Sequence, residues 1–148
     1  MTDLHSAWQA ALAAEHEAVF GYGLLGPHVT GSDEQLAISC SSAHEALRDA
    51  TEADLAGVGL TPMAPAADYP TLYPVRNPAA ARALAVRIED ACAAAWRYFY
   101  LAAASTSEAP GRVLRGAAQH ALVHSAVRAA RWRARATPQH ATRPFPGT

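Results

Sequence analysis

The chain has 148 residues, enough to bury one hydrophobic core, and 37 of them are alanine, the strongest helix former. All twelve Lys/Arg positions are arginine, and the formal net charge is −1. The start of the chain lacks the pattern of a secretory signal, and no run of about 18 uncharged apolar residues occurs, which excludes a typical membrane span. We therefore expect one cytoplasmic domain over residues 1–148, with its two cysteines reduced.

The first half of the chain predicts two antiparallel helices. The first covers about residues 3–25, and its inward face recurs every three or four residues. This face consists of Trp8, Leu12, Glu15, Val19 and Tyr22. After a loop of about six residues, Ser32 and Gln35 form a capping box that begins a second helix, which ends near Gly57. The inward face of the second helix consists of Ala37, Cys40, His44, Leu47, Thr51 and Leu55.

Residues 58–77 show no helical periodicity and are interrupted by prolines. We interpret this segment as a crossover that runs the length of a helical bundle. Twenty extended residues reach about 66 Å, whereas a helix of about 25 residues spans only about 37 Å. The tyrosines of the segment and Leu72 are expected to hold it against the helices.

The second half predicts another antiparallel pair. Asn77 and Pro78 are a typical N-cap and first residue for a helix that ends near residue 105, and a short turn leads to a helix over about residues 111–136. The first of these helices presents inward Ala81, Ala85, Ile88, Glu89, Cys92, Trp96 and Phe99. The predicted inward stripe of the second is Leu114, Ala117, Ala121, His124 and Arg128, with Leu122, Ala129 and Trp132 beside it. Residues 138–148 contain three prolines and predict an irregular tail.

Charge is divided between the two halves. Residues 1–75 hold ten acidic residues and one arginine, whereas residues 76–148 hold three acidic residues and eleven arginines. We interpret this division as an acidic helix pair packed beside a basic pair. Nucleic-acid binding is not favoured, because neither a helix-turn-helix nor a basic segment interleaved with aromatics accompanies the arginines. An acidic partner for the basic half is a weaker alternative.

Two antiparallel pairs joined by one long crossover predict an all-α, ferritin-like four-helix bundle, with the crossover between the second and third helices. Alanine-rich helix surfaces favour a homodimer. Each predicted helix also places one polar residue on an otherwise apolar face. These residues are Glu15, His44, Glu89 and His124. Two carboxylates and two imidazoles in a core would be satisfied by a metal ion such as Fe, Mn or Zn.

A simpler interpretation needs no metal. Glu15 pairs with Arg48 and Glu89 with Arg128, while the two histidines are core residues hydrogen-bonded to the glutamates. In the same interpretation, Tyr22 and Cys40 are packing residues, not redox or thiol groups.

Five motifs carry a resemblance to a known family. They are Ala-Glu-His-Glu-Ala-Val-Phe-Gly-Tyr-Gly at 14–23, Ala-His-x-x-x-Arg-Asp at 43–49, Leu-Ala-x-x-x-Glu-Asp-Ala-Cys-Ala-Ala-Ala-Trp at 84–96, Ala-Val-Arg-Ala-Ala-Arg-Trp-Arg at 126–133 and Phe-Pro-Gly at 145–147. With these motifs the chain resembles an alanine-rich, ferritin-like domain family of unknown function from high-GC bacteria. The resemblance implies a ferritin-like fold but no activity.

The wider ferritin-like superfamily binds a di-iron centre through a Glu on the first and third helices and Glu-x-x-His on the second and fourth. The resemblance implies that Glu15, His44, Glu89 and His124 match four of these ligands. Ser41 and Ala121 stand where the remaining two glutamates belong. A di-iron centre, ferroxidase chemistry and iron storage are therefore not implied.

Two functions remain as hypotheses. The favoured one is a non-enzymatic structural or interaction module with a degenerate metal site, in which an arginine fills the space between the polar residues. The alternative is a metal-binding, redox-active protein in which Glu15, His44, Glu89 and His124 converge on a single Fe, Mn or Zn ion. The sequence establishes no enzymatic activity, because it contains neither a phosphate-binding loop nor a nucleophile motif.

Overall fold

The computed structural model describes residues 4–106 and 109–148, and this part of the chain is 78% helix and has no strand. The four long helices are α1 (Leu4–Leu25), α2 (Ser32–Gly57), α3 (Pro78–Ala104) and α4 (Ala109–Ala136). Three short 3-10 helices lie at Gly26–His28, Pro70–Leu72 and Pro138–His140. The predicted all-helical fold is confirmed. The predicted start at Asp3, and residues 107–108 of the turn before α4, lie outside the described residues.

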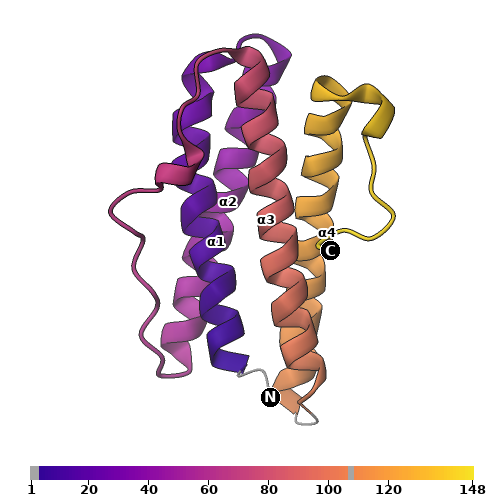
Figure 1. Cartoon of the computed structure of the whole chain (residues 1–148). Coiled ribbons are helices and arrows are strands. Elements are labelled where there is room, and N and C mark those ends of the chain that lie inside the picture. The colour runs from indigo at the N-terminus through magenta and orange to yellow at the C-terminus, as the bar shows by residue number, and fades with distance from the viewer. Residues whose placement is uncertain (1–3, 107–108) are drawn as a thin grey trace.

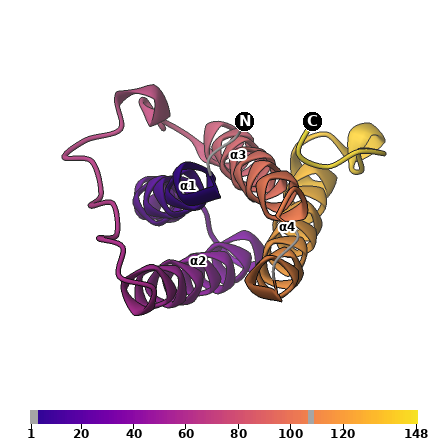
Figure 2. The ribbon, with the colours of Figure 1, turned by 90° about the horizontal axis from the view of Figure 1, so that it is seen from below.

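The helices run alternately up and down, except that α2 and α3 run in the same direction (Figure 1). This is because residues 58–77 carry the chain back along the outer side of α1, from the end of α2 to the start of α3 (Figure 2). Helix α1 packs against both α2 and α3, and α3 packs along α4. Within the described residues, no helix is both long enough and apolar enough to cross a membrane.

Side chains of α1 hold the crossover in place. Gln9 donates a hydrogen bond to the Thr61 carbonyl at 2.8 Å and accepts one from the backbone N–H of Met63 at 2.8 Å. The buried His16 lies with its Nε2 2.9 Å from the Met63 carbonyl oxygen. The backbone of an irregular segment thus finds hydrogen-bond partners on a helix, which a structureless stretch in a compact fold needs.

The middle of the crossover is held by apolar contacts. Leu72 is buried in the core, as the sequence predicts. The ring of Tyr69 packs against Phe20 at a centroid distance of 5.1 Å, and the ring of Tyr73 meets Phe20 edge-on at 6.2 Å. Both tyrosines of the segment therefore contact the bundle.

The two predicted helix starts differ in outcome. The N-cap at Asn77 is confirmed, because its side chain accepts a hydrogen bond from the N–H of Ala80 at 2.8 Å. The capping box at Ser32 and Gln35 is wrong. Ser32 is already the first helical residue, and Gly31 before it supplies no side-chain cap.

The inward face of α4 also differs from the prediction. The buried positions of this helix are Gly111, Ala118, Ala121, Ser125, Arg128, Ala129, Trp132 and Arg133. Of the predicted stripe, Ala121 and Arg128 are buried, as are Ala129 and Trp132 beside it, while Ala117 and His124 are exposed. The physical reason is composition: because alanines occur all round α4, its faces differ little in hydrophobicity. The rotation of α4 about its axis is therefore set by its contact with α3 and not by the pattern of apolar residues.

Candidate functional site

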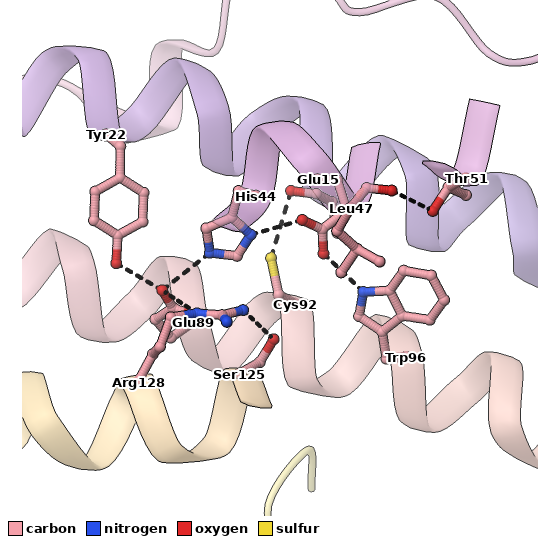
Figure 3. Close-up of polar contacts among 11 residues, drawn as sticks. Glu15, Tyr22, His44, Leu47, Thr51, Glu89, Cys92, Trp96, Ser125 and Arg128 are labelled. Carbon is pink, nitrogen blue, oxygen red and sulfur yellow. Dashed lines mark hydrogen bonds and ion pairs between the residues drawn. The ribbon is translucent and has the colours of Figure 1, made fainter. Parts of the chain in front are cut away.

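Three of the four predicted polar residues meet in the centre of the bundle. Glu15 of α1, His44 of α2 and Glu89 of α3 are each 0% exposed. His44 lies between the glutamates: its Nδ1 is 2.6 Å from Glu15 Oε2, and its Nε2 is 3.0 Å from Glu89 Oε1 (Figure 3). Each comes from the inward face of its helix, so the 3.6-residue period that buries the apolar neighbours also brings these groups together.

The surroundings of His44 favour its charged form. Burial by itself lowers the pKa of the imidazole, but the hydrogen bonds to Glu15 and Glu89 and their negative charges outweigh burial. The pKa of His44 is therefore raised from 6.5 to about 9. At neutral pH the ring is an imidazolium, and both of its nitrogens donate hydrogen bonds to the carboxylates.

Aromatic side chains complete the hydrogen bonding of the glutamates. Trp96 donates its Nε1–H to Glu15 Oε1 at 2.7 Å. Tyr22 donates its hydroxyl to Glu89 Oε1 at 2.6 Å and accepts a hydrogen bond from Trp132 Nε1 at 2.9 Å. Burial, followed by the charge of Glu89, raises the pKa of Tyr22 well above its usual value, so the phenol remains a donor.

Helix α4 contributes an arginine to the cluster. Arg128 Nε donates to both oxygens of Glu89, at 3.1 and 3.0 Å, and its Nη2 donates to Ser125 Oγ at 3.2 Å. The predicted Glu89–Arg128 pair is thus confirmed. With both glutamates ionised, two carboxylates face one imidazolium and one guanidinium, and the charges balance within the core.

His124 does not join the cluster. It lies exposed on α4, where its ring stacks on that of His120 at a centroid distance of 4.0 Å, and it lines a surface groove between α2 and α4. The reason is the rotation of α4 described above, which turns Ser125 inward instead. The predicted Glu15–Arg48 pair is also wrong, because Arg48 contacts its neighbour Asp49, with Nη2 2.8 Å from Oδ1.

A thiol lies beside the cluster. Donor atoms of Glu15, His44 and Cys92 lie within 4.8 Å of one another, the separation expected of metal ligands. Cys92 contacts the Ala14 carbonyl, with its Sγ 3.5 Å from the oxygen. Burial, followed by the charges of the two glutamates, raises the pKa of this thiol well above its usual value, so it stays protonated.

Comparison with known proteins identifies the family of this chain. Residues 7–148 match the family model described as a domain of unknown function, DUF4439. The chain belongs to the DUF4439 family.

A solved structure similar to this DUF4439 domain is that of the conserved hypothetical protein rv2844 from Mycobacterium tuberculosis. It is 33% identical in sequence, with a TM-score of 0.76, over 88% of this chain and 94% of that chain. No curated protein matches the sequence significantly. The solved neighbour supports the fold, and neither its name nor the family description gives an activity.

Sequence reasoning missed part of the polar core. It placed Trp96 and Trp132 on inward faces but assigned their N–H groups no partner, and it did not single out Ser125. One signal was present: an indole N–H that is buried requires an acceptor. Tryptophans on the same faces as buried glutamates therefore indicate hydrogen bonding between them.

Proposed function

We propose that this DUF4439 domain is a ferritin-like bundle that acts as a non-catalytic structural or interaction module, in which polar core residues specify how the helices pack. The observation that carries the proposal is that Arg128 and His44 already pair with both buried glutamates. Within the described residues, every buried side-chain nitrogen and oxygen has a hydrogen-bond partner. The polar core is therefore complete without a ligand.

Such a network favours one arrangement of the helices over others. Glu15, His44, Glu89 and Arg128 come from α1, α2, α3 and α4 in turn, so a shift of any helix leaves a buried charge without its partner. Breaking a buried ion pair by removing one partner costs about 3–5 kcal/mol, whereas the intact pair adds little net stability. The network thus contributes specificity of packing more than stability.

The homodimer expected from the sequence belongs to this proposal. In it, two copies would pair through an exposed helix surface that includes Ile38 of α2, which is 61% exposed. Sedimentation equilibrium tests the assembly, and a chain that remains monomeric at high micromolar concentration contradicts it.

The alternative function is metal binding, and the proximity of Glu15, His44 and Cys92 favours it. As they are arranged, however, these groups do not fit a cation. Both nitrogens of His44 donate hydrogen bonds, the thiol of Cys92 is protonated, and the guanidinium of Arg128 lies beside Glu89. A metal would have to displace protons from two ligands whose surroundings retain them.

Metal content separates the two functions. We expect the purified chain to contain no stoichiometric Fe, Mn or Zn by elemental analysis, even after incubation with Fe(II) or Zn(II) and desalting. The variants His44→Ala and His124→Ala are measured beside it, the second as a control histidine outside the core. Near-stoichiometric metal that disappears in His44→Ala but persists in His124→Ala would overturn the proposal in favour of a core metal site.

A further inference from the structure

Helix α4 has an apolar strip beside the C-terminal tail in addition to its buried side. The residues of this strip are Leu122, Val123, Ala126, Val127 and Ala130. These five apolar residues lie within nine positions of the helix. Two of them, Val123 and Val127, are 50% and 47% exposed. Contiguous apolar surface rimmed by polar residues is a feature of ligand-binding grooves.

These residues form the floor of a groove of about 390 Å³, whose far wall is the C-terminal tail. The rest of its lining is Asp90 and Ala93 of α3, Arg133 of α4, and Thr142, Arg143 and Pro146 of the tail. The volume lies near the lower end of the range of small-ligand pockets, about 300–1,000 Å³. A single short alkyl chain fits this space.

The tail is built to form that wall. It leaves the end of α4, turns back and descends along the bundle (Figure 1). Gly147 anchors it: its φ is +79°, and a Cβ at this position would lie 2.7 Å from the carbonyl oxygen of Ala93. Only glycine meets both conditions without strain. The Phe-Pro-Gly ending noted in the sequence therefore seats the tail on α3, and Pro146 before the glycine lines the groove.

The mouth of the groove carries an excess of positive charge. Arg133 donates to both oxygens of Asp90, and Arg143 Nη1 lies 3.6 Å from Asp90 Oδ2. Within this trio two guanidiniums face one carboxylate. Arg133 already binds both carboxylate oxygens of Asp90, so the charge of Arg143 is not balanced within the trio. The side chain of Arg143 is 54% exposed.

We propose that this groove binds a small amphiphilic carboxylate, with an alkyl chain along Val123, Ala126 and Val127 and its carboxylate at Arg143. The apolar floor excludes a strongly polar ligand, and the exposed guanidinium at one end supplies the matching charge for an anionic head group. A second copy of α4 is disfavoured as the occupant, because it would bring its exposed Arg131 toward these arginines. The groove lies beside the C-terminal tail, so ligand binding here is separable from metal binding in the core.

Isothermal titration with decanoate, below its micelle-forming concentration, tests the site, and decanol serves as the uncharged ligand of equal chain length. We expect one saturable decanoate site. Ala126→Leu, which fills the floor, should weaken binding at least ~10-fold, and Arg143→Gln should weaken it roughly 3-fold, the order for an exposed ion pair. Wild type should bind decanol as weakly as Arg143→Gln binds decanoate. The matched control Ala117→Leu, exposed on the same helix outside the groove, should bind decanoate like wild type.

The location is checked independently of the variants. In the wild-type chain with ¹³C-labelled valine methyls, decanoate should shift the signals of Val123 and Val127 and leave that of the distant, exposed Val58 unchanged. Absence of saturable binding, or equal affinity in Ala126→Leu, overturns the proposal. So does equal affinity for decanol and decanoate. A dimer that dissociates in Val123→Glu would show instead that a second copy covers the groove.

Discussion

At the scale of single residues, Glu89 connects the most partners in the polar core. It accepts hydrogen bonds from Tyr22, His44 and Arg128, which belong to three different helices. Among the residues that the structure describes, Glu15 accepts from His44 and Trp96. Hydrogen bonds to a charged group contribute about 1.5–3 kcal/mol each, and an orphaned partner costs its full desolvation. Removing one residue of this network therefore leaves its partners with unsatisfied hydrogen-bonding groups.

The charge of His44 makes stability depend on pH. Because its pKa in the folded chain, about 9, lies above the ordinary 6.5, its contribution is complete below about pH 6.5 and is lost as pH rises through 9. At about 1.36 kcal/mol for each pKa unit, the whole effect is roughly 3 kcal/mol. Urea unfolding at pH 6 and pH 8.5 should show wild type losing stability, while His44→Gln starts lower and stays level. Parallel losses in the two proteins would contradict this assignment.

The hydroxyl of Tyr22 joins two partners, so its loss should be costly. Tyr22→Phe leaves the indole N–H of Trp132 without an acceptor and removes one donor from Glu89. We expect the free energy of unfolding to fall by about 1–3 kcal/mol. Tyr98→Phe is the matched control, because Tyr98 is 45% exposed, and it should change stability by less than about 0.5 kcal/mol. Chemical denaturation measures both variants. A neutral Tyr22→Phe would mean that the hydroxyl contributes little.

At the scale of elements, the crossover shows how an irregular segment is held. Its hydrogen bonds come from two helices: Gln9 of α1 bonds the backbone on both sides of residue 62, and Arg87 of α3 donates to the Thr71 carbonyl at 2.8 Å. Of residues 58–77, only Leu72 is buried in the core, and the helices bury the rest of their inward faces against one another. Local opening of the segment should therefore be separable from global unfolding.

Loss of the Gln9 amide should loosen the crossover alone. In Gln9→Ala, the Thr61 carbonyl and the Met63 N–H lose their partner, so we expect faster amide hydrogen exchange over residues 60–66 with little change in α3. Gln35→Ala, an exposed glutamine on α2, is the control and should exchange like wild type. Mass spectrometry of peptic fragments resolves the two regions. Unchanged exchange in Gln9→Ala would show that the aromatic contacts suffice.

At the scale of the whole molecule, the acidic and basic halves meet in buried or half-buried ion pairs. Asp33 at the start of α2 accepts from Arg82 of α3 and Arg135 of α4, at 2.7 and 2.8 Å. The predicted packing of an acidic pair beside a basic pair is realised at this end of the bundle. The same attraction acts in the core between Glu89 and Arg128.

These pairs predict a salt-sensitive stability. Asp33→Asn should lower the free energy of unfolding by about 1 kcal/mol at low salt, because the two arginines lose a shared partner that is itself mostly buried. The difference from wild type should shrink at 0.5 M NaCl, where screening acts within roughly 4–5 Å. Asp54→Asn, exposed on the same helix, is the control. A difference that does not change with salt would indicate a packing effect.

The sequence by itself determined the four long helices, the crossover and three buried polar residues, because periodicity and the Asn77–Pro78 start are local signals. Only the tertiary structure decided the rotation of α4, which turns His124 out and Ser125 in, because an alanine-rich helix offers no dominant apolar face. It also decided the partners of the buried indoles: Trp96 with Glu15, and Trp132 with Tyr22, lie 81 and 110 positions apart. Hydrogen bonds over such separations depend on how helices pack, and a local pattern carries no information about that.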